Sequence, residues 1–491
     1  TNLNQKLTIC SKLCFAIGGA PKEVTSSASA FFLQIYLLDV AQQINPFQAS
    51  LVLFIGRVWG AVTDPVIGFL ITKSSWTKIG RLMPILGCTP FLVVSYFCLW
   101  FVPPFINGRF VWYLVFYCLY QTLINCFHVS YSALTMFIST DQKERDSATA
   151  YMTVEVMGTL LGAAVQGQIV ASAHTQKHCS PHNMSAGYLG NSSGAEIVKS
   201  LVPSQEYLSQ AKEVYLIAAG VIGAVFLLCT LVMFLGVKER EPYGPKTEEQ
   251  IPFVQGFLKV MGHGPYIILT AAFLLITVAV QLTQSNFVLF CTYAAGLREH
   301  FQNIVVVILS ALFSIPFWQW FLKRFGKKTA AFCGITWIMP FSMMLVFIPN
   351  LVVAYIVAVS SGLSIAASLL LPSMLPDVVD DFRLTNSSSK GHEAIFYSFY
   401  VFFVKLAAGI TLGVSTLCLF AGYETRGCSQ PPPVVYTLKL LIGAAPIAFI
   451  VTGLMILVLY PINEDVRRRN KLWLEELKQS IDSEPTKIVT C

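Results

Sequence analysis

The ionisable side chains inside apolar runs of membrane-spanning length include seven that could form a functional site. A charge at this depth costs a few kcal/mol on insertion scales, so each of these residues is a candidate functional residue. Buried cations of this kind can bind an anionic head group, whereas a carboxylate can bind an ammonium group or take up a proton. The seven are Lys22, Glu23, Arg57, Asp64, His128, Glu155 and Lys405.

Arg57 and Asp64 are seven residues apart, so on a helix they share one face about two turns from each other. Both could therefore line a polar cavity. The alternative is structural: Arg57 neutralises Asp64, or Lys405 pairs with an acid of the other bundle, and the pair only holds the spans together. His128, on an otherwise apolar stretch, could likewise be a hydrogen-bonded structural residue.

These residues belong to a chain whose composition is that of a membrane protein. Of its 491 residues, 55% are hydrophobic and 12% are charged, against about 25% charged in soluble proteins. The net charge of +7 is spread over short loops, which excludes a nucleic-acid binder, and the apolar content excludes a soluble enzyme or a disordered regulator. We expect an all-α polytopic membrane protein.

Twelve apolar runs of spanning length divide into six before and six after a polar linker. This predicts an N-terminal six-helix bundle at 1–237, a linker at 238–262 that ends in an amphipathic cytosolic helix, a C-terminal six-helix bundle at 263–462 and a tail at 463–491. The predicted spans are 13–40, 47–72, 83–103, 109–138, 147–173, 207–237, 265–293, 301–322, 328–348, 351–376, 393–420 and 433–461.

Lys and Arg cluster in alternate connecting segments, which the positive-inside rule assigns to the cytosol. Both termini are then cytosolic, and we expect a multi-pass protein of the plasma membrane. Cys179 and Cys428 lie in predicted outer loops, where a disulfide between them would persist. Asn183 and Asn191 begin glycosylation acceptors in the same outer loop as Cys179.

The run from Gly56 to Gly68, G-R-V-W-G-A-V-T-D-P-V-I-G, followed by Gly80-Arg-Leu-Met-Pro84, resembles the signature of the melibiose-symporter branch of the major facilitator superfamily. Lys22-Glu23, the segment from Leu375 to Asp380 and Lys405 support the likeness, which covers nearly the whole chain. It implies two six-helix bundles that rock about a central site by alternating access.

Departures from the sugar symporters narrow the expected substrate. Gly60 stands where the resemblance implies an acid of the second span, His128 replaces an acid of the fourth, and Thr153 replaces a sugar-binding Arg. Thr63 and Asp64 alone provide few of the oxygen ligands that a sodium ion needs, so we expect transport without classical sodium coupling. Asp64, His128 and Glu155 remain candidates for coupling or protonation.

Within this branch the chain is similar to the animal lysolipid transporters, through runs such as Cys126-Phe-His-Val and Tyr131-Ser-Ala-Leu-Thr-Met-Phe. The resemblance implies that the transporters of lysophosphatidylcholine keep an acid where this chain has Gly60. Its loss here therefore favours export of sphingosine-1-phosphate and related sphingoid-base phosphates. The alternative is sodium-dependent import of lysophosphatidylcholine.

Candidate ligands for such a lipid combine cations, acids and an apolar wall. We expect a monomer that contacts membrane lipids and needs no cofactor or metal. We do not expect it to be an enzyme. A membrane-embedded lipid enzyme is a further alternative, although the sequence has no HExxH or GxSxG motif; a receptor or scramblase is another. The predicted substrate-binding residues are Lys405, Arg57, Asp64, Glu23, Lys22, Thr63, Tyr36 and Phe403.

Overall fold

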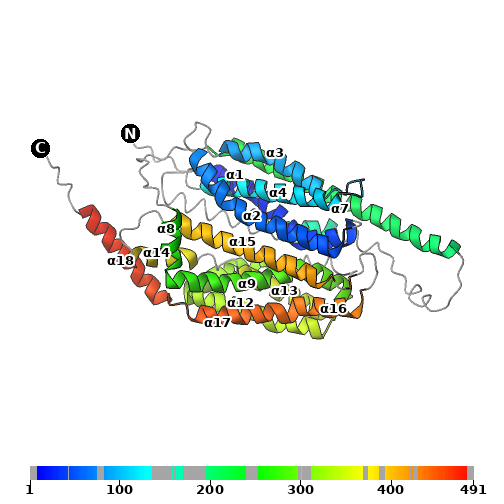
Figure 1. Cartoon of the computed structure of the whole chain (residues 1–491). Coiled ribbons are helices and arrows are strands. Elements are labelled where there is room, and N and C mark those ends of the chain that lie inside the picture. The colour runs from blue at the N-terminus through cyan, green and yellow to red at the C-terminus, as the bar shows by residue number, and fades with distance from the viewer. Residues whose placement is uncertain are drawn as a thin grey trace.

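The computed structural model describes residues 8–41, 44–74, 82–134, 158, 162, 164–169, 172, 194–238, 253–296, 300, 311–368, 374–385, 393–420, 422–423 and 430–483. Every regular element in these ranges is a helix. Figure 1 shows two layers of long, roughly parallel helices, with both chain ends at the same end of the layers. That end is called the terminus face below, and the other end the opposite face.

The first layer comes from the N-terminal half. Helix α2 packs on α4, α3 packs on α4 and α7, and α1 packs on α7. The bounds are α1 (Ile9–Ile35), continued by the π-helical turn η1 (Tyr36–Val40), α2 (Pro46–Ser74), α3 (Leu82–Leu99), α4 (Arg109–Leu134) and α7 (Gly194–Gly236).

The second layer comes from the C-terminal half. Helices α15 and α17 pack on α9, and α13 packs on α11 and α12. The bounds are α9 (Gly264–Leu289), continued by η4 (Phe290–Ala294), α11 (Ala311–Phe325), α12 (Lys327–Phe347), α13 (Leu351–Ser368), α15 (Glu393–Cys418), α16 (Pro432–Lys439), η7 (Leu440–Ala444) and α17 (Ala445–Val458). The layers are called the N bundle and the C bundle below.

Seven helical segments of the described chain are long and apolar enough to cross a membrane, and two shorter apolar helices accompany them. The expected all-α polytopic membrane protein is therefore confirmed. The number twelve stays a prediction, as do the domain boundaries, because parts of the fifth, eighth and tenth predicted spans lie outside the described residues.

The tenth predicted span, 351–376, differs from the structure at its end. Helix α13 ends at Ser368, and Leu375–Thr385 form a separate helix, α14. Pro376 occupies the second position of α14, where a proline removes no helical hydrogen bond. The predicted amphipathic segment at 251–262 contains the helix α8 (Phe253–Met261). Helices α8, α14 and α18 (Glu464–Ser483) all lie at the terminus face (Figure 1).

Charged contacts fix α18 to α14 and α12. Asp377 accepts Lys327 at 3.1 Å and Arg467 at 3.3 Å. One turn further along α14, Asp381 lies 3.3 Å from His263 and accepts a 3.0 Å hydrogen bond from Asn470. The contact with His263 holds the pKa of the Asp381 carboxyl below its usual value.

Aromatic rings fill the N bundle toward the opposite face. Tyr36 is fully buried between Trp100 and Tyr215, with its ring centroid 5.0 Å from each. Its hydroxyl lies 3.2 Å from that of Tyr113. Tyr36 is thus a core residue in this conformation, and its predicted contact with a substrate stays a prediction.

The two bundles meet mainly along α2 and α15, and also along α1 and α9. Glycines on α15 permit this approach: a Cβ at Gly409 would lie 2.7 Å from Cβ of Arg57, and one at Gly413 would lie 2.8 Å from Cβ of Phe54. Ser50 donates a 2.6 Å hydrogen bond to the Gly413 carbonyl. Because α2 and α15 are antiparallel, these contacts continue from the opposite face to the middle of the layers.

Candidate functional site

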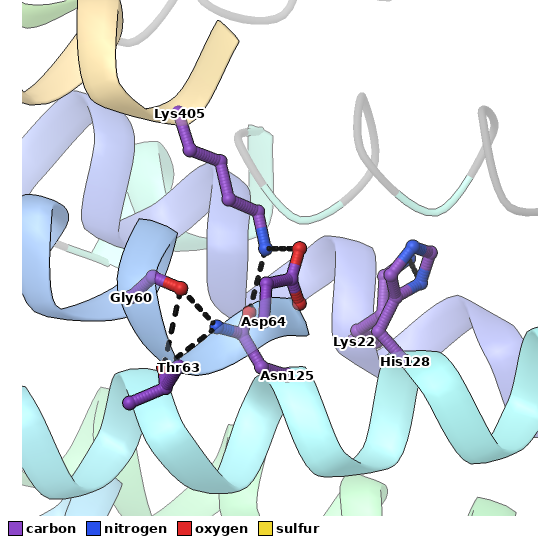
Figure 2. Close-up of polar contacts among 7 residues, drawn as sticks. All are labelled: Lys22, Gly60, Thr63, Asp64, Asn125, His128 and Lys405. Atoms are coloured by element: carbon purple, nitrogen blue, oxygen red, sulfur yellow. Dashed lines mark hydrogen bonds and ion pairs between the residues drawn. The ribbon is translucent and has the colours of Figure 1, made fainter. Parts of the chain in front are cut away.

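Lys405 and Asp64 form an ion pair between the bundles. Nζ of Lys405, on α15, lies 2.9 Å from Oδ2 of Asp64, on α2 (Figure 2). The side chains are 28% and 11% exposed, so the pair is largely shielded from solvent but still accessible. Of the two structural alternatives raised by the sequence, pairing of Lys405 with an acid of the other bundle describes the geometry, and pairing of Arg57 with Asp64 does not.

Asn125 of α4 completes the site and was not predicted. Its Oδ1 accepts a 2.7 Å hydrogen bond from Nζ of Lys405, and its Nδ2 donates to the Gly60 carbonyl at 2.7 Å. Nδ2 also lies 3.4 Å from Oγ1 of Thr63, which itself donates to the Gly60 carbonyl at 3.2 Å. A sequence signal existed, because a polar Asn three residues before His128 shares its helical face.

A second polar group lies beside the first, between α1 and α4. Lys22 lies 2.8 Å from Nδ1 of His128 and 2.7 Å from Oε1 of Glu23. Since an ammonium group only donates, Nδ1 of His128 accepts this hydrogen bond, and the ring is neutral with its proton on Nε2. Asn125 and His128 lie three residues apart on α4, so the two polar groups are neighbours on one helix face (Figure 2).

Two polar atoms at this site are buried and lack a hydrogen-bond partner among the described residues. They are Nε of Arg57, a donor, and Oδ1 of Asp64, an acceptor. Arg57 precedes Asp64 by about two turns on α2. A buried polar atom without a partner costs free energy, roughly 1–3 kcal/mol, which a ligand with the complementary group would recover.

The described side chains of the site include three cations and two acids, so with His128 neutral they leave one net positive charge. This balance favours an anionic ligand, and the bare carboxylate oxygen of Asp64 can accept a hydrogen bond from a cationic group of the same ligand. Phe403, two residues before Lys405, contacts Phe399 and Phe402 through ring edges and tilted faces. These rings can supply apolar surface next to the charged group.

Some predicted residues fall outside the described chain. They are Glu155, Cys179, Cys428, Asn183 and Asn191, and their predicted roles stay predictions. The described residues that follow Glu155 pack on α1 near Lys22: a Cβ at Gly158 would lie 3.1 Å from the Ala20 carbonyl oxygen, and one at Gly162 would lie 2.7 Å from Cα of Val24.

On the opposite face, hydrogen bonds join the two bundles. Asp39, in η1, accepts 2.6 Å hydrogen bonds from Tyr293 and from Tyr423 of the C bundle. One turn closer to the centre, Gln34 donates to Asn286 at 3.3 Å. The polar contacts between described residues of the two bundles therefore lie at the level of Asp64 and Lys405 or nearer the opposite face.

Two bundles of membrane-spanning helices with a charged site at their interface define a multi-pass membrane transporter of the two-bundle type. The family described as MFS/sugar transport protein matches residues 14–464. The chain belongs to this family, as the sequence resemblance predicted.

Named relatives agree with this assignment over almost the full length. The chain is 62% identical to the Sphingosine-1-phosphate transporter MFSD2B of Xenopus tropicalis over 479 residues, which cover 96% of this chain and 92% of that protein. It is 51% identical to the human Sodium-dependent lysophosphatidylcholine symporter 1, over 98% of this chain and 90% of that protein.

Solved structures show the same fold at low identity. A bacterial homolog of the human lysosomal transporter Spinster matches with a TM-score of 0.60 and 14% identity, over 92% of this chain and 95% of that chain. The nucleoside transporter NupG matches with a TM-score of 0.58 and 11% identity, over 91% and 98% of the two chains.

Proposed function

We propose that this protein transports sphingosine-1-phosphate and related sphingoid-base phosphates across the plasma membrane. Transport proceeds by alternating access of the site between the two bundles, in the direction of export and without classical sodium coupling. Both termini are cytosolic, so the terminus face is the cytosolic face. Support comes from the 62% identical relative in Xenopus tropicalis and from a mouse relative of the same name, 50% identical over 93% of this chain.

The observation that carries the proposal is the pair of Lys405 with Asp64, together with a bare acceptor on Asp64 and a bare donor on Arg57, two turns away on the same helix. A sphingoid-base phosphate has an anionic phosphate and, two carbons away, a primary ammonium group. The phosphate fits Lys405 and Nε of Arg57, and the ammonium N–H groups fit Oδ1 of Asp64. Charge-assisted hydrogen bonds of this kind are among the strongest that proteins make.

The same chemistry separates this substrate from lysophosphatidylcholine. The quaternary ammonium of choline has no N–H group, so it cannot donate to Oδ1 of Asp64. The related symporters are named as sodium-dependent, whereas Gly60 supplies no carboxylate here. Import of lysophosphatidylcholine remains the second candidate because relatives with that name, from chicken and human, are 54% and 51% identical to this chain.

Transport by the purified protein in sealed vesicles tests the proposal. Labelled sphingosine-1-phosphate should cross the membrane of vesicles that contain the protein, and it should be recovered chemically intact. An excess of unlabelled sphingosine-1-phosphate should compete, and lysophosphatidylcholine should not. Recovery of a dephosphorylated or acylated product would indicate an enzyme, and preferential movement of lysophosphatidylcholine would support the second candidate.

The mouth of this site is expected to face the cytosol in the conformation described. The contacts of Asp39, Gln34 and Ser50 join the bundles on the opposite face, which is extracellular under this proposal. An export substrate could therefore enter from the cytosol or from the inner leaflet, and the extracellular contacts would have to break before release.

A further inference from the structure

Four oxygen atoms converge on the site from α2 and α4. They are the Gly60 carbonyl oxygen, Oγ1 of Thr63, Oδ2 of Asp64 and Oδ1 of Asn125 (Figure 2). A hard cation is bound by a cage of several such oxygen atoms. Because relatives of this chain are named as sodium-dependent, these atoms are the ones to test for a fit to Na⁺.

Nitrogen donors of the chain itself already engage all four oxygen atoms. The Asn125 amide group donates to Gly60 at 2.7 Å and approaches Thr63 at 3.4 Å. The Lys405 ammonium group donates to Asp64 at 2.9 Å and to Asn125 at 2.7 Å. An ion at the centre of these oxygen atoms would have to displace both donors, and one of them carries a full positive charge.

One further oxygen atom at the site has no donor, but a single oxygen does not form a cation-binding site. Oδ1, the second carboxylate oxygen of Asp64, is outside this set of four and lacks a partner among the described residues. Gly60 brings no carboxylate, and its missing side chain would point at Gln121, with Cβ 3.1 Å from Oε1. The residues present therefore do not fit a bound sodium ion.

We infer that the Lys405 ammonium and the Asn125 amide together replace the coupling cation. Asn125 is then a specificity-determining residue: its amide donors keep the Gly60 and Thr63 oxygen atoms from an ion, while its carbonyl holds Lys405 against Asp64. A symporter binds a cation from solution at such a site, whereas here the positive charge belongs to the side chain of Lys405. This inference concerns the site of the proposed function, but its test measures ion binding and not transport.

Replacing Asn125 by Asp tests the inference directly. Asn125→Asp keeps the side-chain shape, converts the donor nitrogen into an oxygen and adds a carboxylate beside Asp64. We expect the purified variant to unfold about 1–2 °C higher in sodium than in potassium or choline of equal ionic strength, once sodium exceeds its dissociation constant about tenfold. The wild-type protein should unfold at the same temperature in all three salts.

Asn286→Asp is the matched control. Asn286 is a fully buried amide in α9 that accepts from Gln34 and donates to the Leu282 carbonyl at 2.9 Å, with Oγ of Ser285 at 3.3 Å. The same substitution there adds a buried carboxylate beside a carbonyl and a hydroxyl oxygen, but without a second carboxylate such as Asp64. It should gain no sodium-specific shift. If Asn125→Asp does not fold, Gly60→Asp provides the second variant, because the nearest atoms to a Cβ there belong to Gln121, with the side-chain oxygen at 3.1 Å and the others at 3.5 Å or more.

Two results would overturn the inference. One is a sodium-specific rise in the unfolding temperature of the wild-type protein, and the other is a folded Asn125→Asp or Gly60→Asp variant that responds equally to all three cations or only to pH. The predicted salt responses with no movement of sphingosine-1-phosphate would contradict the proposed function and leave the inference standing.

Discussion

At the scale of single residues, Lys405 and Asp64 lower the free-energy cost of each other's charge inside the membrane. Each charge is compensated by a side chain of the other bundle, so separation of the bundles exposes both to an apolar surrounding. Leaving one charge of a buried pair uncompensated typically costs about 3–5 kcal/mol. A substrate that brings its own phosphate and ammonium can compensate both charges while the bundles move.

Single neutralisation of this pair should therefore impair transport strongly. We expect Lys405→Ala and Asp64→Ala each to reach the cell surface and to lower the initial rate about 10–100-fold, since each removes a charge-assisted contact to the substrate. Surface biotinylation gives the amount of protein, and uptake of labelled lipid gives the rate. If the pair were only structural, the single variants would be retained inside the cell, and Asp64→Ala combined with Lys405→Ala would restore both expression and transport.

The sequence located the charged members of the site but not their arrangement. Ionisable residues in apolar runs are conspicuous because their cost in lipid is high, and Lys22, Asp64 and Lys405 were found in this way. Asn125 carries no charge, and its importance depends on the rotation of α4 relative to α2 and α15. Arg57 shares the face of Asp64, yet the sequence could not show that Lys405 would take the carboxylate.

At the scale of elements, α2 and α15 act as a close-packed pair. Gly413 permits contact with Phe54, and Ser50 binds the Gly413 carbonyl. Gly413→Val would push the helices apart where they meet, on the half of the layers nearer the opposite face. We expect an added Ser50→Cys thiol to react at least about tenfold faster with a membrane-impermeant reagent in this background, because its buried site opens more often.

Gly87→Val is the control for this prediction, because a Cβ at Gly87 of α3 would meet nothing within 4 Å. The Ser50→Cys thiol should react at the wild-type rate in that background, after subtraction of the label taken up by native cysteines. Equal reaction rates with Gly413→Val and Gly87→Val would contradict the role given to the glycine contact.

The carboxylate of Asp39 joins η1 to two tyrosines of the C bundle, Tyr293 in η4 and Tyr423 in the segment that follows α15. Tyr293→Phe combined with Tyr423→Phe removes both hydroxyl donors but keeps the rings. Hydrogen bonds to a charged group are worth about 1.5–3 kcal/mol each, so the equilibrium should shift toward opening at the opposite face. The Ser50→Cys labelling rate measures this shift, and an unchanged rate would show that other contacts hold this face closed.

Tyr113→Phe serves as the comparison for the tyrosine variants. Its hydroxyl bonds Tyr36 and the Phe101 carbonyl inside the N bundle, so its loss should leave the labelling rate at the opposite face unchanged.

Most helices could be predicted from hydropathy, because a span is fixed by its length and apolar content. The ends depend on local chemistry that hydropathy averages over. The tenth predicted span ran through Pro376, whereas the charges of α14 engage Lys327, Arg467 and His263 at the terminus face. The π-helical turns at the ends of α1 and α9 could not be predicted, since hydropathy does not distinguish a π-helical turn from an α-helical one.

At the scale of the whole molecule, a covalent tie is expected between the outer loops of the two bundles. A disulfide between Cys179 and Cys428 should appear as a linked peptide when the surface protein is digested without reductant. Its loss in Cys179→Ser should lower surface expression and leave the substrate preference unchanged, because the tie restrains the loops and not the site. Two free thiols in the non-reduced digest would show that the pairing is wrong.

Alternating access requires both bundles and the site between them, and in the proposed function its central step is binding of the substrate phosphate by Lys405. The most direct test compares wild-type protein, Lys405→Ala and the exposed control Lys259→Ala in sealed vesicles supplied with labelled sphingosine-1-phosphate. Wild type and Lys259→Ala should transport at similar rates in sodium and in choline, and Lys405→Ala should fall about 10–100-fold. Normal transport by well-reconstituted Lys405→Ala, or a wild-type rate that collapses in choline, would contradict this mechanism.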